Sequence, residues 1–270
     1  MPELDKFYTK PEIAKYCIDI FKQYSKGIII EPSAGNGAFS SQIDCLAYDI
    51  KPEANDIKEQ DFFTLDLPSQ EFSIIGNPPF GKRSKLAIEF FNYAAKSNAE
   101  VIGFILPITF QKWSVQKQLD NNYSLVESIK LIPDAFLLNN KSYSVRCVFQ
   151  IWVKQPNIFN NIRLFKAPSL THPDFKLYQY NCTPQAEKYF NEDWDFAVYR
   201  QGRKDYTERF YPNQKEIMSR NIQYMFFKAK DNETLTKLKA LDFTELSEWN
   251  MSTPGFGKAD LVMFYNQTYS

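Results

Sequence analysis

The segment that most constrains the fold is a short β-branched run that ends in an acidic residue and passes into a glycine-containing turn. Residues 27–30 read Gly-Ile-Ile-Ile, Glu31 follows, and Gly35 and Gly37 precede an apolar stretch that begins at Phe39. A strand, a glycine turn and a helix start in this order form the first βα unit of a Rossmann-like sheet. Because glycine lacks a Cβ atom, the backbone of such a turn can approach a ligand closely.

The sequence of this turn also limits the kind of ligand. It contains no Gly-Lys-Ser/Thr for a nucleoside triphosphate and no complete Gly-x-Gly-x-x-Gly for a dinucleotide pyrophosphate. An acidic residue in place of a phosphate cradle suits a ligand that carries an amino group. Asp49, near the end of the next apolar run, is placed where a carboxylate accepts hydrogen bonds from adenosine ribose hydroxyls. The plain alternative for Asp49 is a solvated side chain at a strand end.

The remaining N-terminal sequence continues this strand and helix alternation. The hydrophobic pattern predicts helices at 39–43, 84–95 and 112–119, and strands at 45–50, 101–107, 128–133 and 146–153. The run at 101–107 is almost entirely apolar, as a parallel strand covered on both faces requires. The sequence therefore predicts an α/β protein with a Rossmann-like doubly wound sheet and an antiparallel terminal strand.

A rigid polar turn follows another buried strand. Ile74 and Ile75 end an apolar run, and Asn77-Pro78-Pro79-Phe80 comes next. The two prolines fix φ near −65° and remove two backbone donors, so the Asn77 amide and the Pro78 carbonyl form a preformed pair of acceptors. An amine held by two acceptors keeps its lone pair free to act as a nucleophile. Phe80 offers a flat face on which a base can stack.

Asn77-Pro78-Pro79-Phe80 resembles the (Asp/Asn/Ser)-Pro-Pro-(Tyr/Phe/Trp) motif of S-adenosylmethionine-dependent amino-methyltransferases, in the form typical of their adenine-N6 branch. The segment Glu-Pro-Ser-Ala-Gly-Asn-Gly at 31–37 is similar to the cofactor loop of the same family. The resemblance implies a methyltransferase sheet and S-adenosyl-L-methionine as cofactor. It implies catalytic roles for Asn77, Pro78, Pro79 and Phe80, and cofactor contacts for Glu31, Pro32, Ser33, Gly35, Gly37 and Asp49.

The same resemblance assigns three further segments. An aromatic-Tyr-Thr-x-Pro opening, here with Tyr8, Thr9 and Pro11, is similar to the N-terminal element that packs across the methionine end of the cofactor. It also fits a plain amphipathic helix with Thr9 as N-cap and Pro11 in the first turn. In the family, the position of Asp61 and Phe62 contacts the cofactor adenine. The region between the last two strands borders the target base, so either Phe136 or Tyr143 is a candidate second stacking face, and each also fits the core.

The C-terminal part differs in character. We place a boundary at 154–157, with residues 1–154 as the catalytic domain and 155–270 as a smaller β-rich lobe for substrate recognition, containing strands at 162–165 and 196–199 and a helix at 233–241. From Tyr199 to Lys230, eight basic residues, Arg200, Arg203 and Lys204 among them, accompany three acids, and six aromatic residues are interspersed after Tyr199. Such a mixture suits a surface that binds phosphates and stacks unpaired bases. A mixed-charge surface above an aromatic core fits the same residues equally well.

Composition excludes several classes of function. Lys and Arg together number 32, as do Asp and Glu, so a surface for nucleic acid must be local. His172 is the single histidine, which argues against a histidine metal site or a Ser-His-Asp triad, and we expect no metal. Four scattered cysteines indicate a reducing cytoplasmic or nuclear location. Residues 1–6 contain no apolar signal segment and no run has membrane-spanning length, so neither secretion nor membrane insertion is indicated.

These features lead to the hypothesis of an adenine-N6 methyltransferase acting on DNA. The N-terminal element, the glycine loop, Asn-Pro-Pro-Phe and the C-terminal lobe follow the order of adenine-specific DNA methyltransferases, which makes DNA the preferred partner. RNA is a close alternative, because enzymes with the same motif modify RNA as well. Methylation of a protein glutamine at N5 is a third alternative, although those enzymes usually carry Tyr at the position of Phe80. An inactive cofactor-fold module that binds nucleic acid is a fourth.

Overall fold

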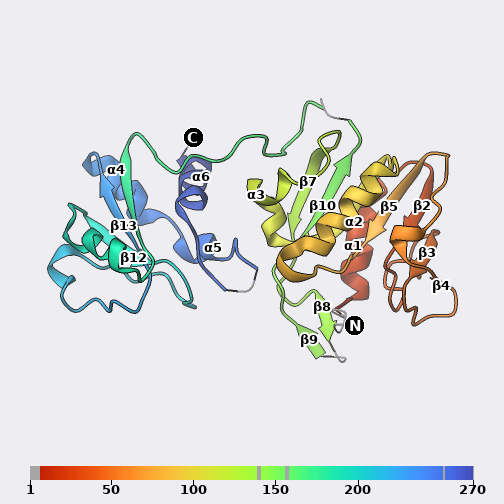
Figure 1. The fold of residues 1–270 in the computed structure, drawn as a ribbon, viewed down its shortest axis with the longest axis horizontal. Coiled ribbons are helices and arrows are strands. Elements are labelled where there is room, and N and C mark those ends of the chain that lie inside the picture. The colour runs from red at the N-terminus through yellow and green to blue at the C-terminus, as the bar shows by residue number, and fades with distance from the viewer. Residues whose placement is uncertain (1–6, 139–140, 156–157, 252, 270) are drawn as a thin grey trace. The chain divides into compact units, whose positions relative to one another are not determined.

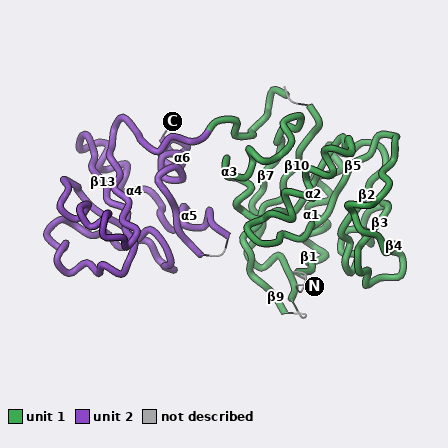
Figure 2. The backbone as a smooth tube through the Cα atoms, viewed as in Figure 1, with its two compact units in different colours: residues 1–166 green, residues 167–270 purple. Residues whose placement is uncertain are grey.

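A computed structural model describes residues 7–138, 141–155, 158–251 and 253–269 of the protein. The chain divides into two compact units, residues 1–166 and 167–270, shown in different colours in Figure 2. Each unit has its own sheet and its own buried core.

Unit 1 is built around a seven-stranded sheet in the order β4-β3-β2-β5-β6-β10-β7 (Figure 1). The first five of these strands run parallel, and β10 is antiparallel to both of its neighbours. The predicted doubly wound sheet with an antiparallel terminal strand is therefore confirmed. The strands are β2 (Ile28–Glu31), β3 (Leu46–Asp49), β4 (Lys58–Glu59), β5 (Phe72–Gly76), β6 (Val101–Pro107), β7 (Ser124–Lys130) and β10 (Cys147–Val153).

Helices cover both faces of this sheet. Gly103 of β6 pairs with Ile151 of β10, and a Cβ on Gly103 would lie 2.5 Å from the ring of Phe21 in α1 (Pro11–Phe21). The next residue of β10, Trp152, packs edge to face on Phe91 of α2 (Lys85–Lys96), with ring centroids 5.2 Å apart. Since successive residues of a strand point to opposite faces, α1 and α2 lie on opposite sides of the sheet.

A second, three-stranded sheet joins the N-terminal segment to the loop before β10. It has the order β1-β8-β9, with β1 (Tyr8–Thr9), β8 (Phe136–Leu138) and β9 (Lys141–Tyr143). Thr9 pairs with Phe136 in this sheet, and Lys10 is the N-cap of α1. The prediction of Thr9 as N-cap is therefore wrong, because strand pairing takes that residue.

Two other local predictions differ from the structure. Residues 39–43 form turns, although a helix was predicted there. The backbone N–H of Ser40 donates to the Glu31 side chain, and that of Gln42 donates to the Phe39 carbonyl, so these groups do not form the hydrogen bonds of an α-helix. The helix predicted at 112–119 is only α3 (Trp113–Gln116), which follows the 3-10 helix η3 (Ile108–Gln111).

Unit 2 contains an antiparallel sheet in the order β11-β13-β12 with packing on both faces. Met225 and Phe227 of β13 lie in one apolar cluster with Leu238 and Leu261, while Phe226 lies in a second cluster on the other face. The predicted strand at 196–199 and helix at 233–241 are present, but residues 162–165 form no strand. The elements are β11 (Phe175–Tyr180), η4 (Pro184–Asn191), β12 (Phe196–Tyr199), η5 (Pro212–Gln214), β13 (Tyr224–Ala229), α4 (Asn232–Ala240), α5 (Phe243–Ser247) and α6 (Lys258–Tyr269).

The chain after Lys154 remains part of unit 1 as far as Lys166. The buried Arg163 donates to the backbone carbonyls of residues 116, 119, 120 and 123 at 2.6–2.9 Å. Its guanidinium thereby fixes residues 158–166 to the end of α3. This anchoring explains why the units divide twelve residues beyond the boundary predicted from the sequence. Of that predicted boundary, Pro156 and Asn157 lie outside the described residues.

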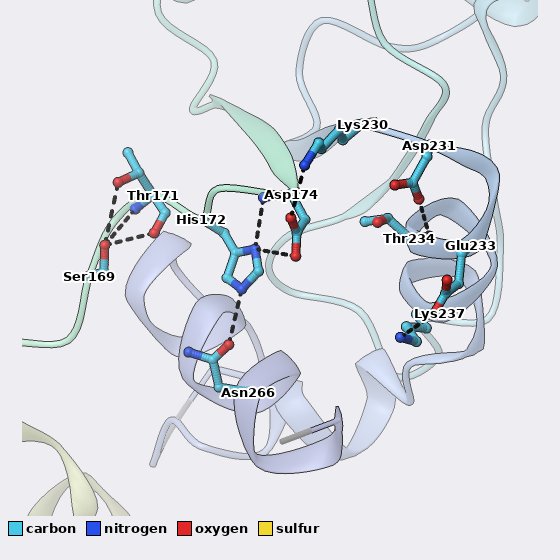
Figure 3. Close-up of polar contacts among 10 residues, drawn as sticks. All are labelled: Ser169, Thr171, His172, Asp174, Lys230, Asp231, Glu233, Thr234, Lys237 and Asn266. Atoms are coloured by element: carbon cyan, nitrogen blue, oxygen red, sulfur yellow. Dashed lines mark hydrogen bonds and ion pairs between the residues drawn. The ribbon is translucent and has the colours of Figure 1, made fainter.

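His172 has a packing role in unit 2 (Figure 3). Its Nδ1 accepts from the backbone N–H of Asp174 at 3.1 Å, and its Nε2 lies 3.2 Å from Oδ1 of Asn266 in α6. The ring also stacks on Phe175, with centroids 4.4 Å apart. These contacts attach the start of unit 2 to its last helix. Across the described residues, no helix combines the length and apolar character needed to cross a membrane.

Candidate active site

A cavity of about 290 Å³ lies at the carboxyl ends of the parallel strands of unit 1. Strands β2 and β5 are neighbours, with Ile30 opposite Ile74, so the turns that follow them meet at one edge of the sheet. This edge is where open α/β sheets bind their ligands. Thirteen of the fifteen predicted catalytic and cofactor residues line the cavity: Tyr8, Thr9, Glu31, Pro32, Ser33, Gly35, Asp49, Asp61, Phe62, Asn77, Pro78, Pro79 and Phe80.

The Asn77 side chain has one of its two polar atoms free. Its Nδ2 donates to the backbone carbonyl of Phe7 at 3.2 Å, and its backbone carbonyl accepts from the Ser33 hydroxyl at 3.2 Å. Its Oδ1 is buried and has no hydrogen-bond partner among the described residues. Because a buried acceptor without a partner is unfavourable, this oxygen is ready to accept a hydrogen bond from a ligand in the cavity.

Glu31 lies at the end of β2 and is only 1% exposed. Burial raises the pKa of its carboxyl group to about 8, and the negative charges of Asp49 and Asp56 act in the same direction. The opposing contribution comes from Ser40, whose backbone N–H donates to Glu31 Oε2 at 2.9 Å. A cation placed beside this carboxyl would favour its ionised form.

Asp49 shapes the glycine turn from the neighbouring strand. Its Oδ2 accepts from the N–H of Gly35 at 2.8 Å and its Oδ1 from the N–H of Lys51 at 2.7 Å. Each carboxylate oxygen keeps one lone pair for a ligand hydroxyl. Gly35 has φ +53°, which favours glycine at this position. Gly37, with φ +85°, shapes the same turn but is not part of the cavity lining.

At the predicted adenine end, the roles of two adjacent aromatic residues differ. Asp61 accepts from the N–H of Phe63 at 3.0 Å and thereby caps the 3-10 helix η1 (Phe62–Thr64). Phe62 is 2% exposed and packs on Phe90 and Tyr93, whereas Phe63 is 36% exposed and also lines the cavity. Sequence reasoning missed Phe63, because two consecutive phenylalanines do not reveal which one faces the core.

The N-terminal strand contributes one wall of the cavity. The Tyr8 hydroxyl donates to Glu53 Oε1 at 2.6 Å, and the Thr9 hydroxyl is buried with no partner among the described residues. Pro11 begins α1 and is not a lining residue. Phe7 and Glu53 line the cavity but were not predicted, because their positions depend on tertiary contacts that no local motif signals.

The two candidates for a second stacking face have different surroundings. Phe136 is fully buried in the core and has no free ring face. Tyr143 is 38% exposed and stacks on Phe7, with centroids 4.7 Å apart and an angle of 15° between the planes. Of these two stacked residues, Phe7 lines the cavity and Tyr143 does not.

The basic residues predicted to bind substrate lie in unit 2. Arg200 donates to the Phe256 carbonyl at 3.2 Å and to the side chains of Gln201 and Gln223, and burial lowers the pKa of its guanidinium. The guanidinium of Arg203 lies 4.4 Å from the ring centroid of Tyr199, and Lys204 is exposed. Of the six interspersed aromatic residues, Tyr211 is exposed and the others are buried, namely Tyr206, Phe210, Tyr224, Phe226 and Phe227. Five of the six thus belong to the core.

The cavity at the carboxyl edge of the sheet thus brings together the glycine turn that follows β2 and the Asn77–Phe80 turn that follows β5. Two curated proteins are similar in sequence, the type II methyltransferases M.HincII of Haemophilus influenzae and M.HindII of its strain Rd, each 32% identical over 94 residues. These relatives confirm the predicted resemblance to the methyltransferase family. The match covers 31% of this chain and only 18% of either relative. No family model matches the sequence.

Solved structures with a similar arrangement include two methyltransferases. A putative RNA methyltransferase from Pyrococcus horikoshii has a TM-score of 0.43 at 15% identity, over 56% of this chain and 88% of its own. The 23S rRNA methyltransferase ErmE has a TM-score of 0.42 at 14% identity, over 56% of this chain and 70% of its own.

Proposed function

We propose that the protein transfers the methyl group of S-adenosylmethionine to the N6 amino group of adenine in DNA. The single observation that carries this proposal is the Asn77 side chain, whose Oδ1 is buried at the cavity without a partner among the described residues. An exocyclic amine supplies the N–H donor that this oxygen lacks. Phe80, which also lines the cavity, provides an apolar ring face for the base.

The residues around the cavity fit the proposed cofactor. Glu31 suits its α-amino group, Asp49 its ribose hydroxyls, and Asp61 with Phe62 and Phe63 its adenine. The pKa of about 8 means that the Glu31 carboxyl group is mostly protonated at pH 7 in the free protein. This is compatible with the assignment, because an ammonium group bound beside the carboxyl would lower its pKa and favour the ionised carboxylate. When bound, S-adenosylmethionine supplies an electrophilic methyl group on a sulfonium ion.

Asn77 and the Pro78 carbonyl orient the amine in this proposal. Hydrogen bonds from the two N–H groups to these oxygens direct the nitrogen lone pair away from the turn and stabilise the positive charge that develops on nitrogen. In such a transfer the N–CH₃ bond would form as the S–CH₃ bond breaks, leaving a neutral thioether and an ammonium ion that would lose its proton to water. No strong base is required, and His172 is committed to other contacts. Pro79 keeps the turn rigid.

The order of the segments along the chain favours DNA as the substrate. The N-terminal strand reaches the cavity from before the glycine loop, and the Asn-Pro-Pro-Phe turn and a separate C-terminal unit follow, as in the adenine-specific DNA methyltransferases that the sequence resembles. The two type II methyltransferase relatives support methyl transfer but match only a fraction of their own length. RNA is therefore the alternative that the experiment must separate from DNA.

The test is a tritium-transfer assay with separate DNA, RNA and protein pools, followed by mass spectrometry of the modified nucleoside. We expect N6-methyladenine in DNA. Asn77→Ala should reduce transfer by about 100-fold or more, since it removes an acceptor that acts on the transition state. Cofactor affinity, measured by calorimetry, should stay within about threefold of wild type. Asn55→Ala, at an exposed turn residue outside the cavity, is the matched control.

Two results would contradict the proposal in different ways. If Asn77→Ala transfers methyl groups at the wild-type rate, the role of Asn77 is wrong. If the folded wild-type protein binds the cofactor but modifies no nucleic acid, the proposed reaction itself is wrong, and label in the protein pool would indicate a protein substrate.

A further inference from the structure

The orientation of the Asn77 amide depends on a residue far from it in the sequence. The acceptor of Asn77 Nδ2 is the backbone carbonyl of Phe7, 3.2 Å away. A carbonyl oxygen only accepts hydrogen bonds, so only the NH₂ end of the amide can face it. The inverted amide would place two acceptor oxygens against each other. The Phe7 carbonyl therefore determines that Oδ1, rather than Nδ2, is left for a substrate amine.

Phe7 needs an anchor of its own, because it lies before the first strand. Strand β1 contains only Tyr8 and Thr9, which pair with Leu137 and Phe136 of β8. The Phe7 ring reaches past β8 to the other edge of this small sheet, where it stacks on Tyr143 of β9. The centroid distance of 4.7 Å and the interplanar angle of 15° describe a stacked aromatic pair.

We infer that Tyr143 is a positioning residue for the proposed methyl transfer: by stacking on Phe7, it holds the Phe7 carbonyl where that carbonyl orients the Asn77 amide. The inference rests on the proposed function, and it assigns Tyr143 a different role from the base contact suggested by the sequence. Tyr143 does not line the cavity, whereas Phe7 and Asn77 both do. Tyr143 stacks on Phe7, and the Phe7 carbonyl accepts from Asn77 Nδ2, so all three residues are connected within unit 1.

The experiment compares Tyr143→Ala with Tyr143→Phe in steady-state methyl transfer, using the full-length protein and the nucleic acid that the wild type modifies. Tyr143→Ala removes the stacked ring, and we expect kcat to fall about tenfold, the size of one aromatic pair expressed as a rate. KM for nucleic acid and Kd for the cofactor should remain within about twofold. Tyr143→Phe keeps the ring and should restore kcat. Lys141→Ala, on the same exposed strand, is the control for damage to the hairpin.

The outcomes separate this inference from its alternatives. A rise in KM for nucleic acid with unchanged kcat would overturn it and make Tyr143 a substrate contact. A loss in Tyr143→Phe equal to that in Tyr143→Ala would also overturn it, since the hydroxyl rather than the ring would then be required. A fall in kcat that Lys141→Ala reproduces would assign the effect to the hairpin as a whole. Wild-type kcat in Tyr143→Ala, with Asn77→Ala inactive, would refute the inference but leave the proposed function standing.

Discussion

The carboxyl group of Glu31 should make the unfolding free energy of the protein depend on pH, and the substitution Glu31→Gln should remove this dependence. Its pKa is raised from 4.5 to about 8, chiefly because burial disfavours the charged form. At about 1.4 kcal/mol for each pKa unit, this difference corresponds to about 5 kcal/mol between the two ends of the titration. Glu31→Gln keeps the size of the side chain and cannot ionise, so it isolates this contribution.

The sign follows from the two pKa values. Below pH 4.5 the carboxyl is protonated in both the folded and the unfolded chain, and its contribution to stability is fully present. As the pH rises from 4.5 to 8, the unfolded chain releases the proton while the folded chain retains it, so the unfolding free energy falls. Above about pH 8 both states are ionised and the contribution has been lost.

The measurement is urea unfolding of wild type and Glu31→Gln at pH 4, 6 and 9, monitored by circular dichroism. The difference between the two proteins cancels most other titrations. We expect Glu31→Gln to gain about 5 kcal/mol relative to wild type between pH 4 and pH 9. Glu59→Gln, which makes the same substitution at an exposed glutamate of β4, is the matched control. A difference between wild type and Glu31→Gln that stays constant with pH would refute the assignment of a neutral buried carboxyl.

The same proton provides a signature of cofactor binding. With a pKa of about 8, roughly nine tenths of the Glu31 carboxyl groups are protonated at pH 7. If the ammonium group of S-adenosylmethionine binds beside Glu31, close to one proton should be released on binding. Calorimetry in two buffers of different ionisation enthalpy counts this proton, and Glu31→Gln should release none. Equal proton release by both proteins would place the ammonium group elsewhere.

Two further predictions concern the scaffold. Arg163→Met leaves four backbone carbonyls without their buried donor and should lower the unfolding free energy by about 3 kcal/mol, measured by urea unfolding; an unchanged midpoint would mean that water replaces the guanidinium. Gly27→Ala should lower the melting temperature far more than Gly202→Ala. Both glycines have positive φ, but only a Cβ on Gly27 would collide with a backbone carbonyl, that of Glu71 at 1.8 Å, whereas Gly202 has open space around it. Similar losses from both would show that φ strain alone decides the cost.

The main features of the fold were predictable because they depend on patterns within short segments. The apolar runs at β5 and β6 have to be buried on both faces, and this requirement indicates a parallel sheet covered by helices. Predictions failed where a distant contact overrode a local preference. Thr9 has a side chain suited to an N-cap, but its backbone pairs with Phe136. Residues 162–165 have a strand-like composition, but their path is set by Arg163, whose buried guanidinium donates to the Tyr123 carbonyl.

The candidate site shows the same division. Glu31 and Asn77 could be predicted as candidates because each belongs to a turn whose motif is complete within a few residues. Their proximity follows from the parallel pairing of β2 with β5, which no local pattern contains. Phe7 and Glu53 escaped prediction for the same reason, since one is held by Tyr143 and the other accepts a hydrogen bond from Tyr8.

The position of Gly76 links these two turns physically. It is the last residue of β5, its φ is +156°, and a Cβ built there would lie 3.5 Å from Cγ of Glu31 and 3.8 Å from the Ser33 hydroxyl. The backbone of β5 therefore passes close to the glycine loop just before Asn77. Ser33 completes the connection by donating to the Asn77 carbonyl at 3.2 Å. The loop that we assign to the methyl donor and the turn that we assign to the acceptor are thus held together by the main-chain pairing of β2 with β5 and by the hydrogen bond from the Ser33 side chain to the Asn77 carbonyl. These contacts limit the distance between the two proposed reactants.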